Sequence, residues 1–118
     1  MHGLPADLDL SFLVGPTLLQ VCIGENEVIL RFDGDVSITI ESTFVVRDEG
    51  GCETAFECAR AAASALVEFL ADSITEVLGQ RSGTLRLTFS RGGVVEIYDS
   101  FEDFESYQIQ HGKDLHVV

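Results

Sequence analysis

Two stretches of the chain alternate hydrophobic and polar residues with a period of two, which is typical of strands that bury one face. In the first stretch, 17–23, 28–32 and 36–40 form strand patterns, and 44–47 can continue them. Asp33-Gly34 stands between the second and third patterns and favours a type I′ hairpin turn, because both residues tolerate a positive φ. We therefore predict a β-meander over about 17–47.

The centre of the chain has a helical pattern instead. Residues 55–71 are rich in alanine, and their larger apolar side chains recur at helical spacing on one face. Thr54 and Glu57 form a capping-box pattern at the start of this stretch. We predict one long helix over about 55–71.

The period of two returns after Asp72. Residues 74–78 are mainly apolar but irregular, 84–90 alternate regularly, and 95–97 follow a turn. We predict a second meander over about 74–118, in which Phe89 takes the position that Phe32 has in the first. Both rings should face the helix in the core.

The two meanders are alike in sequence. VILRFDGDVSITIES, which begins at Val28, and LRLTFSRGGVVEIYDS, which begins at Leu85, share an apolar-x-Leu-x-Phe strand, a glycine turn and a β-branched strand. The second copy is one residue longer. Aligning Ile38 with Ile97 keeps the buried face, whereas aligning the two acid-Ser pairs breaks it. The agreement favours an internal repeat over the likeness that any two hairpins share.

These patterns predict an α+β fold: a curved antiparallel sheet of about seven strands from two similar β-meanders, with one long helix packed on it. At 118 residues the chain should form a single domain over 1–118. Either meander alone would leave an apolar face in water, so we expect both to share one core.

One segment combines aromatic rings with carboxylates. YDSFEDFESYQI, which begins at Tyr98, holds four aromatic and four acidic residues. In a structural interpretation, a capped turn places the rings inward, and a strand follows with Tyr107 and Ile109 on one side. In a functional interpretation the segment is a binding surface, because tyrosine is enriched at interfaces. The candidate binding residues are Tyr98, Asp99, Phe101, Glu102, Glu105 and Tyr107.

The net charge of −13 is the strongest feature of the composition. Twenty acidic residues against seven basic ones disfavour nucleic acids and anionic membranes as partners, and they favour a basic protein. The same charge can also serve solubility alone. The sequence shows neither a secretory signal nor an apolar run of membrane-spanning length, so we expect a cytoplasmic protein. Its cysteines, Cys22, Cys52 and Cys58, should then be reduced thiols.

Most of the chain, apart from its alanine-rich stretch, resembles an uncharacterised family of small bacterial proteins. The likeness lies in a G-x-L-x-L-x-F-x-x-G hairpin followed by an aromatic-Glu-small-aromatic element. These are Gly83, Leu85, Leu87, Phe89 and Gly92, then Phe104, Glu105, Ser106 and Tyr107. The resemblance implies no established activity and transfers no catalytic residues. Some small acidic bacterial proteins of similar style neutralise toxins, which is an analogy only.

Patterns for catalysis and metal binding are weak. The chain has no phosphate-binding glycine loop and no local motif that joins a nucleophile to a histidine. Asp33-Gly34-Asp35 is only a fragment of a calcium loop and lacks the downstream ligands. We therefore predict a protein that is not an enzyme and that uses no cofactor or metal.

The leading hypothesis is a non-enzymatic, acidic, cytosolic binding module for a protein partner, of a type that could neutralise a toxin. One alternative is a small-molecule-binding domain with a pocket between helix and sheet, near Tyr98, Phe101 and Tyr107. Another alternative is a self-associating protein, such as a homodimer joined through exposed strand edges.

Overall fold

A computed structural model of the chain describes residues 10–25, 27–41, 43–48, 50–51, 53–56, 64–80, 83–98 and 107–117. This described part is built mainly of β-strands. The elements are η1 (Ser11–Leu13), β1 (Leu18–Ile23), β2 (Val28–Phe32), β3 (Val36–Ile40), β4 (Phe44–Arg47), β5 (Glu53–Phe56), β6 (Ile74–Gly79), β7 (Leu85–Phe89), β8 (Val94–Ile97), β9 (Tyr107–His111) and β10 (Asp114–Val117).

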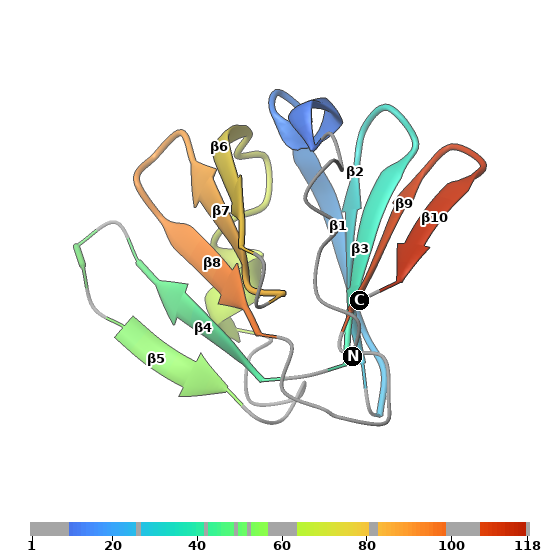
Figure 1. Ribbon diagram of the computed structural model, residues 1–118. Coiled ribbons are helices and arrows are strands. Elements are labelled where there is room, and N and C mark those ends of the chain that lie inside the picture. The colour runs from blue at the N-terminus through green and yellow to red at the C-terminus, as the bar shows by residue number, and fades with distance from the viewer. Residues whose placement is uncertain are drawn as a thin grey trace.

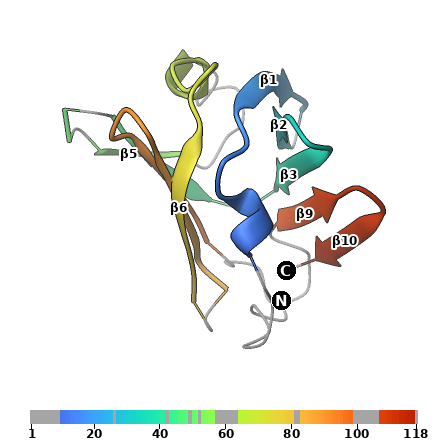
Figure 2. The same cartoon turned by 90° about the horizontal axis from the view of Figure 1, so that it is seen from above.

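The strands form two antiparallel five-stranded sheets (Figure 1). One sheet has the order β1-β2-β3-β9-β10, and the other has the order β5-β4-β8-β7-β6. Seen from above, the sheets form two facing layers, as in a β-sandwich (Figure 2). The predicted α+β class, with a single sheet of about seven strands, is therefore wrong.

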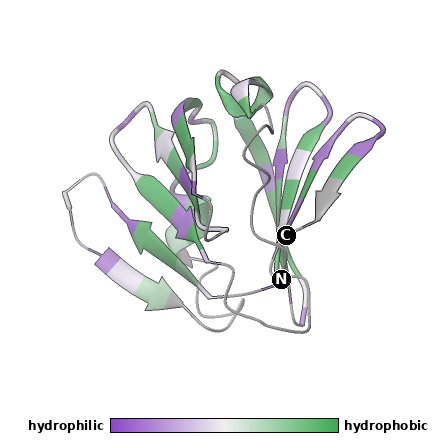
Figure 3. Cartoon of the chain, in the orientation of Figure 1, coloured by the Kyte–Doolittle hydropathy of each residue, from purple (hydrophilic) through white to green (hydrophobic). Residues whose placement is uncertain are grey.

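Alternate side chains of each strand fill the space between the layers. Leu30 and Ile38 of one sheet and Leu87 and Ile97 of the other belong to the same buried cluster. Hydrophobic residues accordingly run through the strands of both sheets (Figure 3). The expected core shared by the two meanders is confirmed.

Each sheet combines three strands of one meander with a hairpin from the other half of the chain: β9–β10 joins β1-β2-β3, and β4–β5 joins β6-β7-β8. β4 follows β3 in sequence but pairs with β8 of the opposite sheet, where Phe44 lies opposite Ile97. β9 follows β8 but pairs with β3, where Tyr107 lies opposite Ile40. Residues 44–47 therefore do not extend the first meander, and both sheets contain strands from both halves.

The two meanders have matching strand registers. Leu18 of β1 lies opposite Phe32, Ile74 of β6 lies opposite Phe89, and the register then shifts in both pairs. The residues just before these strands, Thr17 and Ser73, form a bridge between the two sheets.

The register also shows which residues of the two hairpins correspond. Val28 of β2 lies opposite Ile40, and Leu85 of β7 lies opposite Ile97. Ile97 therefore corresponds to Ile40, and the predicted alignment of Ile97 with Ile38 is wrong. Duplication of the sequence itself stays a prediction.

The long helix predicted over 55–71 is wrong. Ala55 and Phe56 belong to β5, where they pair with Val45 and Phe44. Among the described residues of this stretch, only 64–67 are helical, and turns follow until Ala71, whose φ is 69°. Residues 57–63 lie outside the described part. The strand pairing with β4 outweighs the local helical spacing, which carries no information about distant partners.

The segment 64–71 nevertheless covers part of the core. The ring of Phe69 stacks on Phe89, with centroids 4.8 Å apart and an interplanar angle of 15°. Backbone hydrogen bonds tie the segment to β1: Ala71 N–H donates to Leu18 O, and Leu18 N–H donates to Asp72 O, each at 2.9 Å. These contacts fix the chain at the start of β6.

The predicted core positions of Phe32 and Phe89 are confirmed, since 4% and 1% of these residues are exposed. Their ring centroids lie 6.5 Å apart. They meet across the two sheets instead of facing a long helix.

The hairpin predicted at Asp33-Gly34 is present, but its turn differs by one residue. The positive φ angles fall on Gly34 and Asp35, at 74° and 59°. The Asp33 carboxylate instead accepts a hydrogen bond from the Thr17 N–H at 2.9 Å.

Candidate functional site

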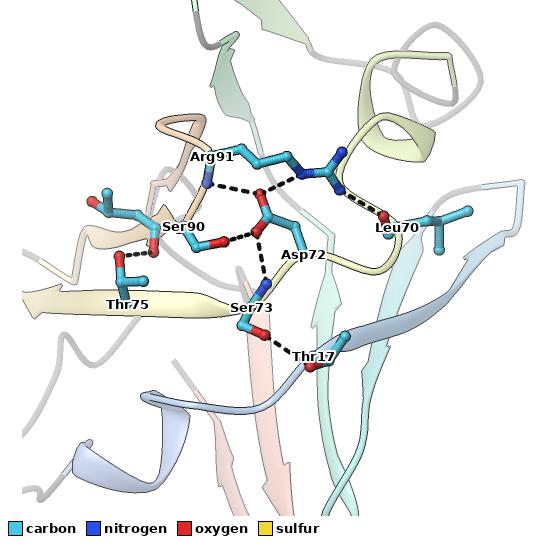
Figure 4. A network of polar contacts seen from close by, with 8 residues as sticks. Thr17, Leu70, Asp72, Ser73, Thr75, Ser90 and Arg91 are labelled. Carbon is cyan, nitrogen blue, oxygen red and sulfur yellow. Dashed lines mark hydrogen bonds and ion pairs between the residues drawn. The ribbon is translucent and has the colours of Figure 1, made fainter.

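The most elaborate polar site in the described part surrounds the buried carboxylate of Asp72 (Figure 4). Only 3% of Asp72 is exposed. One carboxylate oxygen accepts hydrogen bonds from the Ser73 N–H at 2.9 Å and from the Ser90 hydroxyl. The other accepts a long hydrogen bond from the Arg91 N–H at 3.3 Å. Three donors therefore satisfy a charge that burial would otherwise make costly.

The Arg91 side chain closes the site from the solvent side. Its Nε lies 3.4 Å from Asp72 Oδ2, and its second guanidinium nitrogen donates to the carbonyl of Leu70 at 2.9 Å. This arginine therefore joins the β7–β8 turn to the segment before β6. Because 53% of its side chain is exposed, its charge also faces solvent.

The environment of Asp72 keeps its carboxyl ionised. Burial alone would raise its pKa. The hydrogen bonds from Ser90 and from the two backbone N–H groups, together with the Arg91 charge, outweigh burial and hold the pKa below its ordinary value. An anionic carboxylate whose lone pairs are occupied is suited to holding turns together rather than to accepting a proton in catalysis.

A pocket of about 380 Å³ lies beside this network. Its walls come from β4, β5, the 64–72 segment and the β7–β8 turn. It is lined by Val46, Asp48, Gly50, Thr54, Ala65, Glu68, Phe69, Asp72, Arg91 and Gly93. The volume falls in the range of small-molecule sites, about 300–1,000 Å³.

One wall of the pocket depends on the absence of a side chain at Gly93. A Cβ built there would lie 2.1 Å from Cε1 of Phe69. The Phe69 ring can therefore lie against the backbone just before β8 only because residue 93 is glycine.

The two tyrosines predicted as binding residues have different environments. Tyr107 is fully buried, and its hydroxyl donates to the carbonyl of Gly83, so it is not the exposed anchor that the binding interpretation requires. Tyr98 is half-buried, and its hydroxyl donates to Glu96 at 2.6 Å. This hydrogen bond, with burial and the charge of Glu96, raises the pKa of Tyr98 to about 12.

The other predicted binding residues, Asp99, Phe101, Glu102 and Glu105, lie outside the described part of the chain. The predicted strand that follows them is confirmed for its described residues. Tyr107 and Ile109 are buried on one side of β9, while Gln108 is half-buried on the other.

The sequence interpretation missed Asp72, Ser90 and Arg91. Asp72 was only the residue before a strand, and Ser90-Arg91 was only part of a turn. The two hairpin turns occupy matching places, because Ser90 N–H donates to Ser73 O as Asp33 N–H donates to Thr17 O. The sequence alone does not show this correspondence, which becomes visible only when the two meanders are superposed.

Within the described residues, no group of three or more His, Cys, Asp or Glu side chains is arranged to hold a metal ion. The ring of His111 stacks on Phe12, with centroids 4.4 Å apart and an interplanar angle of 4°. Cys22 is a half-buried free thiol, whereas Cys52 and Cys58 lie outside the described residues.

None of the helices in the described ranges has the length and apolar character to cross a bilayer.

Fold and site thus define a β-sandwich of two antiparallel five-stranded sheets, with a buried aspartate network that joins the β7–β8 turn to the start of β6. Residues 11–118 match the family of unknown function DUF6188, and the chain belongs to this family. The expected membership of an uncharacterised family is confirmed. No curated protein and no solved structure matches the chain.

Proposed function

We propose that this protein is a non-enzymatic binding module whose acidic surface receives a basic protein partner. The observation that carries the proposal is the net charge of −13. A potential of this size accelerates encounter with an oppositely charged protein and disfavours anionic polymers. Neutralisation of a basic toxin is one form that this function could take.

The pairing of the basic residues supports this proposal. Arg47 lies 2.7 Å from Glu53, Arg86 lies 3.9 Å from Glu96, and Arg91 pairs with Asp72. Each ion pair neutralises one basic and one acidic side chain, so the net negative charge of the protein is unchanged. Other acids in several parts of the fold, including Glu25, Glu68 and Glu76, are exposed.

We also propose a cytoplasmic location, where the cysteines would stay reduced. The acidic aromatic segment that begins at Tyr98 remains our candidate for the contact surface, through Asp99, Glu102 and Glu105. The burial of Tyr107 removes that residue from the candidate surface.

The test begins with capture of a partner from the native host at low salt, followed by binding kinetics with the purified partner at low and high salt. Replacing Asp99, Glu102 and Glu105 by their amides should slow association by about tenfold, while dissociation changes little. A control in which Glu25, Glu27 and Glu76 become glutamine changes the net charge equally. The proposal would be refuted if the association rate of the partner changed neither with salt nor on replacement of Asp99, Glu102 and Glu105.

A second candidate function is small-molecule binding, and the pocket of about 380 Å³ beside Phe69 favours it. Its place differs from the predicted one, since β4, β5 and the 64–72 segment line it instead of Tyr98 and Tyr107. Native mass spectrometry of protein purified from its host would detect a retained ligand. Release of that ligand by Thr54→Phe, a substitution that narrows the pocket, would favour this function over the first.

A further inference from the structure

A second concave surface lies on the outer face of the β1-β2-β3-β9-β10 sheet, and it shares no lining residue with the pocket beside the Asp72 network. Its volume is about 580 Å³. It is lined by Leu19, Gln20, Arg31, Phe32, Asp35, Val36, Ser37, Gln110, Gly112 and Lys113. All these residues belong to the described part of the chain, and strand pairing fixes the relative places of six of them: Gln20, Arg31, Phe32, Val36, Ser37 and Gln110.

Four polar side chains form one row across this sheet. Gln20 lies opposite Arg31, Arg31 lies opposite Ser37, and Ser37 lies opposite Gln110. Neighbouring strands are about 4.8 Å apart, so the row spans roughly 14 Å. Amide, guanidinium and hydroxyl donors therefore stand side by side on a rigid surface.

The two cations of this surface differ from the other basic residues of the described part. Arg47, Arg86 and Arg91 pair with acids, whereas Arg31 and Lys113 have no ion pair within the described residues. Arg31 and Lys113 both line the same concavity. On a strongly acidic protein, their convergence gives this site a local charge opposite to that of the whole chain.

The turns at the end of the sheet hold the site in shape. Gly112 N–H donates to the backbone carbonyl of Asp35 at 2.9 Å, which joins the β2–β3 turn to the β9–β10 turn that carries Lys113. The Gln110 amide donates to the Gly112 carbonyl at 3.3 Å, and its second N–H stays available for a ligand. The Asp35 carboxylate offsets one of the two positive charges, so the site has a modest net charge of about +1.

An apolar side chain borders the polar row. Leu19, in the shifted part of β1, is 61% exposed. We propose that this concavity binds a small organic anion, in which a carboxylate or phosphate contacts Arg31 and Lys113 and an apolar portion contacts Leu19. The planar guanidinium matches two oxygens of either group, and the lysine adds a point charge.

This site is independent of the proposed protein partner, and its test uses defined probes. Benzoate, phenyl phosphate and uncharged benzyl alcohol share an aromatic ring and differ in the anionic group. Titration of each into the full-length protein, followed by amide NMR shifts, should show saturable binding of at least one anion at the residues of the row. Benzyl alcohol should bind at least about tenfold more weakly, because a hydrogen-bonded charge typically contributes that much. Equal binding of benzyl alcohol, or no shifts in the row, would overturn the proposal.

Single substitutions then separate local recognition from overall charge. Arg31→Gln should weaken binding of the preferred anion about tenfold, and Lys113→Gln about threefold. Arg47→Gln removes the same charge from the other sheet and should change affinity by less than about twofold. Equal weakening by Arg31→Gln and Arg47→Gln would refute the site. Since Lys113 lies in an exposed turn, Lys113→Gln tests the site even if Arg31→Gln fails to fold.

Discussion

The close approach of Phe69 to Gly93 predicts that Gly93→Ala destabilises the protein. The new Cβ would lie 2.1 Å from Cε1 of Phe69 and 2.9 Å from Cζ. Carbon atoms normally stay about 3.5–4.0 Å apart, so the ring or the strand must move by about 1.5 Å. The ring has little room, because Phe69 is only 6% exposed and stacks on Phe89.

Overpacking of a core usually costs about 1–3 kcal/mol, and we expect about 3 kcal/mol here, because strand pairing and ring stacking both resist the movement. For a chain of this size, that loss lowers the melting temperature by roughly 12 °C. Urea titration followed by circular dichroism would measure the free energy of unfolding.

A double-mutant cycle with Phe69→Leu identifies the cause. Phe69→Leu removes the clashing ring atoms and should itself cost about 1–2 kcal/mol. The variant carrying both changes should then lose at least about 1 kcal/mol less than the sum of the single losses. Additive losses, or a Gly93→Ala loss below about 0.5 kcal/mol, would show that the ring does not restrict this glycine.

Three further predictions concern single side chains. Asp72→Asn should cost about 1–3 kcal/mol at neutral pH, since it removes a buried, hydrogen-bonded charge. Because folding lowers the pKa of Asp72, its contribution is present above the pKa of the unfolded carboxyl and is lost as pH falls through the folded value. The stability gap between the two proteins should therefore narrow below pH 3.8, and a constant gap in urea titrations would contradict this account. Phe89→Ala should cost about 3–5 kcal/mol, and a loss below about 1 kcal/mol would place the ring outside the core. Glu96→Gln should lower the pKa of Tyr98 from about 12 toward 10.0, as measured by phenolate absorbance, and an unchanged titration would exclude Glu96 as the cause.

The strands could be predicted from the sequence because their signal is local. The alternation of Val28, Leu30 and Phe32 with partly exposed residues depends only on which face of the strand is buried. The Asp33-Gly34 pair likewise marks a turn wherever the hairpin lies. These features identify the two meanders and the burial of Phe89, whatever sheet each strand joins.

The arrangement of the strands could not be predicted, because their pairing depends on distant residues. Nothing near Phe44 indicates that it lies opposite Ile97. For the same reason, Ala55 and Phe56 fit a helical pattern although β4 holds them in a strand. Asp72 depends on Ser90 and Arg91, so its role appears only after the fold brings the three together.

The exchange of hairpins between the sheets has a consequence for the order of folding. Ile38 of β3 has its partner Ile109 far along the chain, and β4 requires β8, which is also distant. Neither meander can finish its sheet while the other half is unfolded or still being synthesised. Contacts so remote in sequence make folding slow, and the open edges of β3 and β8 can meanwhile pair with other chains. The protein should therefore depend on chaperones, or on dilution, more than its length suggests.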